Sequence, residues 1–323
     1  NNKNNNKGKN MNNLKKIGLT ALAASLVTTS AFAGEMSVAG SASIGVKNTT
    51  GTNTALGKSW TMGNQLTFTG GGELDNGMNV SLSFIIDQAD DSTTGLANSP
   101  FDSHSVTISS DALGSFKFSG EGGSSAQGAM DAGAAGDLWN NGTGVAEITG
   151  AAAGNNSMFY TLPSMVDGLE VTASMSPGKA AQETHTSYGV AYTGVEGLTV
   201  KFGQGDSGAP GAEIESTTMM ASYAIGSFTV SASNTEADKT GANNREVRSY
   251  QVAYTLSDSM SATYGTETYE TVGSSTDEEI DSLGVSYTTG GMTLSATTFD
   301  TEGAGNTAGA KTERWALGLS FAF

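Results

Sequence analysis

The last ten residues, RWALGLSFAF (314–323), decide the fold, because every second side chain among them is large and apolar. The positions between them carry arginine, alanine, glycine and serine. Alternation with a period of two is typical of a β-strand that has one apolar face and one polar or small face. The apolar face is formed by Trp315, Leu317, Leu319, Phe321 and Phe323.

The same alternation recurs along the chain and predicts an all-β protein. Apolar residues alternate with small or polar ones in 38–46, 78–86, 169–175 and 250–256. The 44 glycines and the aromatic content of 7% would by themselves suit a disordered chain. The periodicity indicates regular strands instead.

The connections between these segments alternate between short turns and long polar loops. The short turns are predicted at 74–77, 110–114, 166–168, 194–197, 225–227, 257–259 and 289–291. The long loops are predicted near 48–60, 88–102, 121–155, 177–183, 204–213, 237–244, 271–278 and 301–311. Seven turns and eight loops join 16 strands, with the turns on one rim and the loops on the other. This pattern predicts a 16-stranded antiparallel transmembrane β-barrel of bacterial type.

The polar face of the strands indicates a membrane barrel rather than a soluble sandwich. It is rich in Gly, Ser, Thr and Ala, and the charged residues gather in the predicted loops. A face of this kind suits a water-filled lumen, while the apolar face suits lipid, where a charge would be costly. Every backbone polar group inside lipid must be paired, so the sheet has to close on itself.

The amino end has the layout of a secretory signal peptide. Met11 is followed by two lysines, an apolar run over 17–27 and the small-residue site Ala-Phe-Ala that ends at Ala33. We predict cleavage between Ala33 and Gly34. The apolar run is shorter than the roughly 20 residues that a transmembrane helix needs. The predicted divisions are a start-site extension at 1–10, the signal peptide at 11–33 and the barrel at 34–323.

Composition argues against several classes of protein. The absence of cysteine excludes a small disulfide-stapled scaffold, and two histidines without cysteine cannot form a usual zinc site. Five of the 15 Lys and Arg residues precede Gly34, so the exported part carries ten of them against 32 Asp and Glu. Such a balance argues against a nucleic-acid partner, whose phosphates need basic residues.

Over the whole of 34–323, the sequence resembles general porins of the alphaproteobacterial type. The carboxyl-terminal strand, with Phe321 and the terminal Phe323, resembles the strand by which outer-membrane barrels are recognised for insertion. The opening stretch 34–46 and the LDNGM turn at 74–78 are similar to those porins. The resemblance implies an outer-membrane homotrimer of 16-stranded barrels, with lipid, lipopolysaccharide and the assembly machinery as partners. It also implies a third external loop that folds into each lumen.

The longest predicted loop, 121–155, is the third and takes the place of that constriction loop. Its small residues suit a segment that narrows a pore without plugging it, although the proline-bearing motif of enterobacterial porins is absent. The predicted acidic constriction residues are Glu121, Asp131, Asp137 and Glu147. Alternation places a basic set on the inner wall, and its members are Lys47, Lys117, Lys201 and Arg314. A transverse field between the two sets predicts a weak to moderate cation preference. Alternatively, the loop acids are only solvated, or they bind divalent ions shared with lipopolysaccharide.

Other motifs carry weaker functional signals. The segment 205–210, GDSGAP, resembles the nucleophile motif of chymotrypsin-like proteases, but a triad needs a histidine base held near the serine. Neither His104 nor His185 has a recognisable context, and we expect no catalysis. The acidic runs 87–91 and 277–279 could hold Ca²⁺ loosely, although both lack the spacing of a calcium loop. No cofactor is otherwise expected.

Two further functions stay open on the sequence. A secreted all-β adhesin or surface-layer protein would also alternate, but it would be soluble without detergent. A substrate-selective porin would carry aromatic residues on its inner face, and the sequence shows no such ladder. Trp139 in the long loop could stack on a sugar, yet an anchor that packs the loop against the wall is the favoured interpretation.

Overall fold

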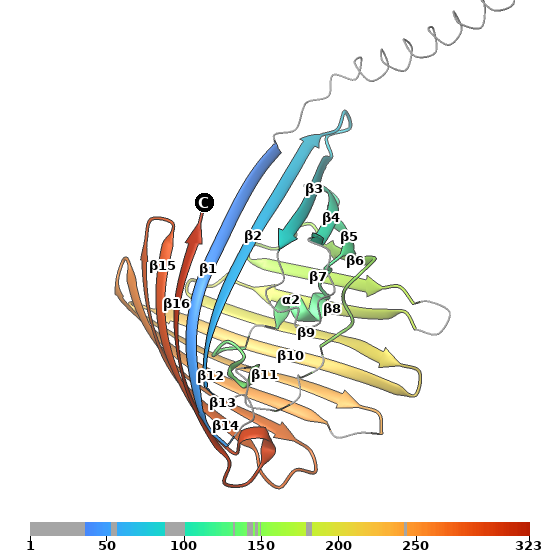
Figure 1. Ribbon diagram of the computed structural model, residues 1–323. Helices are drawn as coiled ribbons and strands as arrows, with labels where there is room; N and C mark the ends of the chain where they lie inside the picture. Colours follow the sequence, from blue (N-terminus) through green and yellow to red (C-terminus); the bar gives the residue numbers. More distant parts are fainter. Residues whose placement is uncertain are drawn as a thin grey trace, which may run out of the picture.

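The computed structural model describes residues 36–52, 57–87, 101–131, 133–140, 145, 148, 150–178, 183–241 and 244–323, without the side chains of 101 and 140. Within them, 16 antiparallel strands close into one barrel (Figure 1). The strands are β1 (Met36–Gly51), β2 (Gly57–Glu73), β3 (Asn79–Asp87), β4 (Phe101–Ser110), β5 (Gly114–Glu121), β6 (Ser157–Thr161), β7 (Leu169–Ser176), β8 (His185–Tyr192), β9 (Leu198–Ala209), β10 (Ala212–Ile225), β11 (Phe228–Lys239), β12 (Arg245–Ser257), β13 (Met260–Thr271), β14 (Glu278–Thr289), β15 (Met292–Glu302) and β16 (Lys311–Ala322). The predicted fold class is confirmed. The predicted extension, signal peptide and cleavage site at Ala33 and Gly34 lie outside the described residues.

Strands β1 and β16 close the barrel and pair in register over 11 positions, with Lys47 opposite Ala316. Beyond that ladder, the Gly40 N–H donates to the carbonyl oxygen of Phe323 (2.7 Å), and the Phe323 N–H donates to that of Gly40 (2.9 Å). The Phe323 ring lies over Gly40, where a Cβ would collide with it. Closure leaves no unpaired strand edge in lipid, which removes a large free-energy cost.

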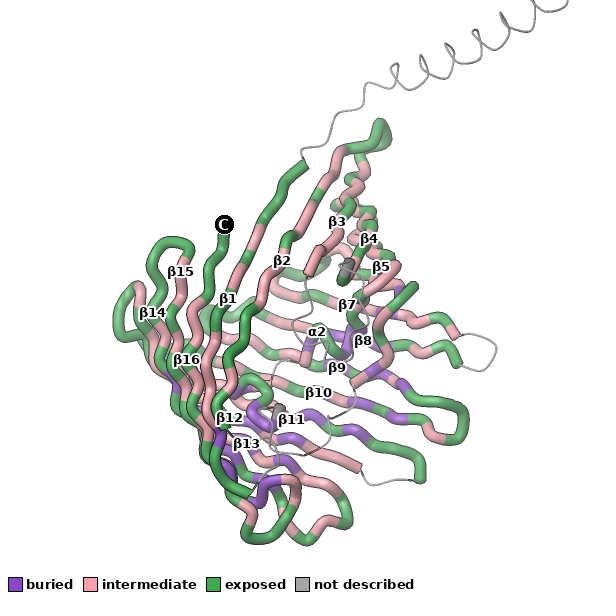
Figure 2. Tube along the Cα trace, viewed as in Figure 1, coloured by how far each residue is buried: buried purple, intermediate pink, exposed green. Residues whose placement is uncertain are grey.

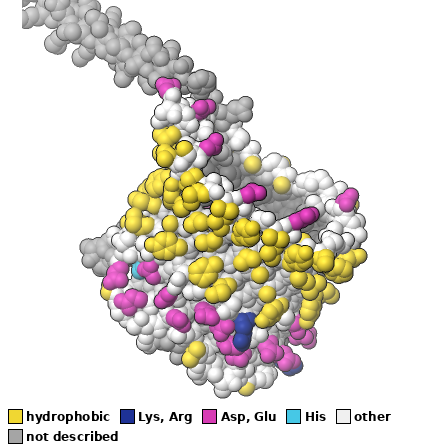
Figure 3. Space-filling view, turned by 180° about the vertical axis from the view of Figure 1, so that it is seen from behind, with side chains coloured by type: hydrophobic (Ala, Val, Ile, Leu, Met, Phe, Trp, Pro, Cys, Tyr) yellow, Lys and Arg dark blue, Asp and Glu magenta, His cyan; other side chains and the backbone are white. Residues whose placement is uncertain are grey.

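Side chains alternate between the outer surface and the lumen along every long strand. In β16, Trp315 and Leu317 are 38% and 47% exposed on the outside, whereas Arg314 and Gly318 face inward. Hydrophobic side chains form a band on the outer surface, and acidic side chains gather along one edge of it (Figure 3). Exposed tyrosines lie on the same outer surface, as expected for an aromatic girdle: Tyr188, Tyr223, Tyr250, Tyr254, Tyr264 and Tyr287.

Several strands are longer than the sequence predicts. The predicted loop at 204–213 is wrong, because β9 runs to Ala209, β10 starts at Ala212, and a two-residue turn joins them. Gly211 in that turn has φ 78°, which glycine adopts without strain. The predicted loop at 48–60 is likewise shorter. Asp206 and Glu213, which the prediction assigned to the loop at 204–213, therefore lie on the outer faces of strand ends.

The short turns on the opposite rim are confirmed. In the turn between β2 and β3, the Leu74 N–H donates to the carbonyl oxygen of Met78 (2.7 Å), and Gly77 has φ 78°. The helices of the described residues are all too short or too polar to cross a membrane.

A small hydrophobic core lies inside the barrel rather than between two sheets. Buried residues gather on the strands around helix α2 (Ala126–Met130), which lies within the barrel (Figure 2). The wall contributes inward-facing residues of β10 to β14, namely Ile214, Ala237, Val247, Tyr269 and Ile280. The segment between β5 and β6 contributes Ala135, Leu138, Trp139 and Ile148. The core therefore fastens that segment to the inner wall.

Candidate functional site

The segment between β5 and β6, residues 122–156, is called the lumenal loop below. It contains α2 and the short 3-10 helix η1 (Leu138–Asn140), and α2 lies inside the barrel (Figure 1). The predicted range of 121–155 is therefore nearly right. Glu121 is not part of the loop, because it is the last residue of β5 and pairs with His104 on β4.

Glycines on the wall let α2 approach the strands closely. A Cβ at Gly203 on β9 would lie 2.9 Å from the Cα of Gln127, and a Cβ at Gly189 on β8 would lie 2.7 Å from the carbonyl oxygen of Ala126. Contacts this short need a residue without a side chain. The inward glycines of β8 and β9 therefore form a cradle for the loop helix.

Hydroxyl groups of the wall satisfy the backbone of the lumenal loop. The Ala126 N–H lies 2.8 Å from Ser187 Oγ and 2.9 Å from Ser174 Oγ. Further along the loop, the Ala135 N–H donates to Ser249 Oγ at 2.8 Å. Within α2, Ser125 Oγ accepts from the Gly128 N–H at 2.9 Å, which caps the helix. Buried backbone groups must find such partners, so these bonds fix where the loop lies.

The second half of the loop is anchored by Trp139. Its side chain is 7% exposed, and its ring centroid lies 6.0 Å from that of Tyr269 on β13. The Trp139 backbone N–H donates to Glu267 Oε1 at 2.8 Å. The favoured interpretation of Trp139 as an anchor agrees with this packing, because a ring so buried has no open face for a sugar.

Asp131 and Asp137 lie in the lumenal loop, as predicted, and line one cavity of about 330 Å³ together with Gln127, Trp139 and Thr235. Asp131 Oδ1 accepts from the hydroxyls of Thr218 (2.9 Å) and Thr235 (2.8 Å), so this carboxylate also fastens the loop to the wall. Glu147 lies outside the described residues.

Asp137 has φ 53°, in the left-handed region. Burial raises the pKa of the Asp137 carboxyl above its usual value, and the neighbouring Asp131 raises that pKa further. Hydrogen bonds from the Trp139 side chain and the Gly133 backbone act in the opposite direction. The charge of Asp137 is therefore lost earlier on acidification than that of an ordinary aspartate.

The four predicted basic residues all lie on the inward-facing side of their strands, but not on one wall. Lys47 and Arg314, on β1 and β16, lie across the barrel from β9, because β1 and β9 are eight positions apart in the closed order of 16. Lys117 is on β5, and Phe159, directly opposite it on β6, also faces the lumen. Lys201 lies on β9 beside Gly203, on the same wall as α2. A single basic cluster opposite the loop is therefore not what the structure shows.

The geometry is that of an aqueous barrel narrowed by an internal loop, and the comparisons with known proteins agree with it. The family model described as Gram-negative porin matches residues 18–278. The chain belongs to the Gram-negative porin family. No curated protein matches the chain.

Solved porin structures share the fold at low sequence identity. An anion-selective porin from Comamonas acidovorans superposes with a TM-score of 0.68 and 15% identity, covering 90% of this chain and 99% of that one. The OmpF of Salmonella typhi, in complex with daunomycin, gives 0.70 and 13%, covering 90% and 98%. The OmpT of Vibrio cholerae in its trimer form gives 0.67 and 16%, covering 90% and 100%. At these identities the likeness concerns the fold alone.

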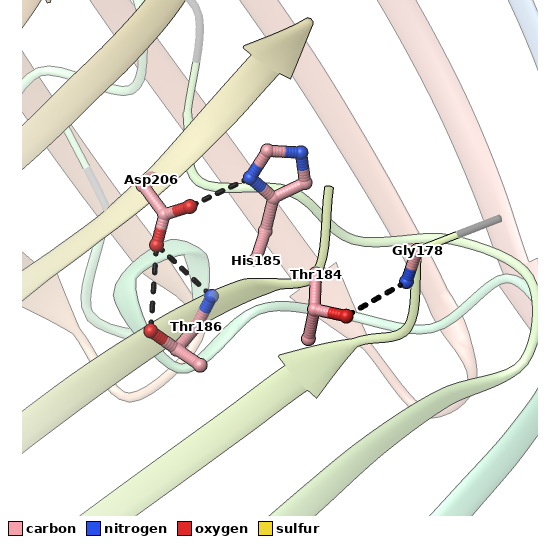
Figure 4. A network of polar contacts seen from close by, with 5 residues as sticks. All are labelled: Gly178, Thr184, His185, Thr186 and Asp206. Carbon is pink, nitrogen blue, oxygen red and sulfur yellow. Dashed lines mark hydrogen bonds and ion pairs between the residues drawn. The ribbon is translucent and has the colours of Figure 1, made fainter. Parts of the chain in front are cut away.

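The protease-like motif has a structural role in this porin. Asp206 on β9 contacts His185 Nδ1 through Oδ2 (2.6 Å) and accepts from the Thr186 N–H through Oδ1 (3.0 Å) (Figure 4). Ser207 is the next residue of the strand, so its side chain points to the opposite face, where it is 7% exposed. The side chains of Ser207 and Asp206 therefore lie on opposite faces of the wall.

The described residues of the acidic runs form no ion-binding cluster. Glu278 is buried and faces inward, whereas Glu279 is exposed on the outer face of β14. In the part of the chain that the structure describes, no group of three or more acidic or histidine side chains could hold a metal ion. Residues 88–91 of the other run are outside that part.

Two features of the porin lumen escaped the sequence analysis. Phe299 faces inward on β15 and lies 5.4 Å below the Arg314 guanidinium, and Tyr269 faces inward beneath the loop. Glu267 is 1% exposed at the contact between loop and wall. A signal for Glu267 exists, because it is the one acidic residue on the inner face of β13, where the other residues are serine, threonine, glycine and Tyr269.

Proposed function

We propose that this porin forms a water-filled channel in the outer membrane for passive diffusion of small hydrophilic solutes and ions. The observation that carries the proposal is the lumen itself, a closed barrel lined mainly by small and hydroxyl side chains and narrowed by a loop fixed to one wall. The adhesin alternative is not favoured, because the barrel has no open strand edge and the family is one of channels. For the same reason we infer no catalytic role.

We infer further that the channel prefers cations weakly. The support is charge: Asp131 and Asp137 line one cavity in the loop, and the wall groups that bond Asp131 are the neutral hydroxyls of Thr218 and Thr235. Lys47 and Arg314 on the far wall complete a transverse field. A porin with a similar fold is described as anion-selective, so the sign must come from this chain's own residues.

Single-channel recording in a planar bilayer with a salt gradient tests both proposals. Stepwise ohmic openings with a reversal potential of the cation-selective sign are expected from the detergent-refolded protein. A reversal potential of the opposite sign would remove the selectivity claim and keep the channel. Folded, inserted protein that never conducts would remove the channel.

We also propose that the protein is a homotrimer exported by its amino-terminal signal peptide. A similar porin has been solved in a trimer form, and the outer surface of β2 and β3 offers the stacked pair Phe68 and Phe84, with centroids 4.6 Å apart. Light scattering of the detergent complex, with the detergent mass subtracted, is expected to give three chains. One chain per particle would contradict this.

Lipopolysaccharide is the proposed partner of the outer surface. Asp281, Asp300 and Glu313 lie directly opposite one another on the exposed outer faces of β14, β15 and β16. Like charges in this position repel, and divalent ions shared with lipid phosphates would offset the repulsion. Retention of purified lipopolysaccharide is expected to fall when EDTA is added, and retention independent of EDTA would oppose the bridging.

A further inference from the structure

The carboxyl group of Glu267 occupies an unusual position for a charged group. It lies on the inner face of β13, is 1% exposed, and is covered by η1 of the lumenal loop. Its Oε1 accepts from the Trp139 backbone N–H at 2.8 Å. Its Oε2 is fully buried without a hydrogen-bond partner in the part of the chain that the structure describes.

Among the residues that the structure describes, the elements packed around Glu267 place no cation beside its carboxyl group. Its cross-strand neighbours are Ser249 on β12 and Ile280 on β14, both uncharged. Asp137 faces it from the loop and carries the same charge. The other titratable groups lie one or two rungs toward the loop rim, and they are Tyr269, Glu278 and Arg245.

An ionised Glu267 carboxylate would destabilise the docked state of the loop. Burying a charge without a paired cation strongly destabilises a folded protein. A neutral carboxyl avoids that destabilisation, and its O–H can donate while the other oxygen keeps the bond from Trp139. When the loop leaves the wall, water reaches the group and it ionises as an ordinary glutamate does.

We propose that Glu267 is a positioning residue that holds the lumenal loop on the wall in its protonated form, and that its ionisation releases the η1 end of the loop. The proton is exchanged with water in the lumen. The docked state binds one proton more than the released state, so raising the pH favours release. For one proton, the ratio of docked to released loop falls at most about tenfold per pH unit. This proposal rests on the proposed channel function only where open-channel noise is the quantity measured.

The test compares the unmodified porin with Glu267→Gln over about pH 5 to 9, a range chosen around the usual glutamate and histidine values. The amide imitates the neutral carboxyl and keeps an acceptor for Trp139, so the loop should stay docked throughout. Open-channel noise should rise with pH in the unmodified porin and stay flat in Glu267→Gln. The matched control is Glu278→Gln, a carboxyl that is equally buried but bonded to Gly305 in another loop (2.7 Å), which should keep the pH profile.

A second readout does not depend on conduction. Acrylamide quenching of Trp139 fluorescence, measured with Trp60 and Trp315 replaced by phenylalanine, should increase with pH unless Glu267 is glutamine. A flat profile in the unmodified porin, or the same profile in Glu267→Gln, would overturn the proposal. If no variant conducts, the proposed channel fails, while the quenching still decides the role of Glu267.

Discussion

Replacing Gly203 with alanine is expected to loosen the lumenal loop. A Cβ at this position would lie 2.9 Å from the Cα of Gln127 and 3.0 Å from its carbonyl oxygen, whereas ordinary contact begins at 3.4 Å. The backbone of α2 must therefore retreat by about 0.5 Å or more, because neither contact involves a flexible side chain. An extra methyl group in a packed contact costs about 1–3 kcal/mol. A change of that size shifts the ratio of docked to released loop by about 5- to 150-fold.

The assay is single-channel recording of conductance and open-channel noise. Gly284→Ala is the matched control, because this glycine also faces the lumen, and its Cβ would meet the rotatable hydroxyl of Thr263 (2.7 Å) rather than the loop. Gly203→Ala should increase the noise and alter the unit conductance, and Gly284→Ala should resemble the unmodified porin. Equal noise in all three proteins would refute the idea that the glycine cradle positions the loop.

Three further predictions concern charge, closure and lipid contact. The cation preference should weaken as the pH falls through the raised pKa of Asp137, and the variant Asp137→Asn should show a flatter pH dependence. Reversal potentials measured across the pH range check this prediction, and an unchanged profile in the variant would contradict it. Deleting Phe323 removes both backbone hydrogen bonds to Gly40, each of which contributes about 0.5–1.5 kcal/mol. The refolding yield, measured on gels of unheated samples, should therefore drop. An undiminished yield would show that closure of the barrel does not need the last residue. Leu317→Lys places a charge on the lipid face and should lower the free energy of unfolding by up to about 2–4 kcal/mol, measured by urea titration in lipid vesicles. The inward-facing Thr297→Lys should leave that free energy almost unchanged. Equal urea midpoints for the two variants would count against the assigned faces.

The fold could be predicted because the inner face stays small and polar along nearly every strand. The alternation over 314–323 survives in β16, and turn residues such as Gly77 mark the short rim. The prediction failed at 204–213, where glycine, aspartate and serine suggested a loop. On the lumenal side of a strand, the same small residues allow close packing. A Cβ added at Gly205, for example, would lie 2.7 Å from the Cβ of Ala151. Composition alone cannot separate these two uses.

The site could be predicted only in outline. The lumenal loop was identified because it is the longest predicted loop and the third of the long loops, but the wall residues that its own residues contact are distant in the chain. Asp131 bonds to Thr218, 87 residues away, and Trp139 bonds to Glu267, 128 residues away. Contacts of this range leave no local periodicity in the sequence. Lys47 and Arg314 lie on the adjacent strands β1 and β16, whereas Lys117 and Lys201 lie four and eight strands away from β1, so an inward orientation alone does not gather the four into one cluster.

The most direct test of a passive, water-filled channel is the swelling rate of proteoliposomes in iso-osmotic neutral sugars of increasing size. The lumen described above predicts swelling that slows steadily with solute size and rises linearly with the concentration gradient. Swelling that saturates with one sugar, or vesicles that do not swell although folded protein is inserted, would contradict general diffusion through this barrel.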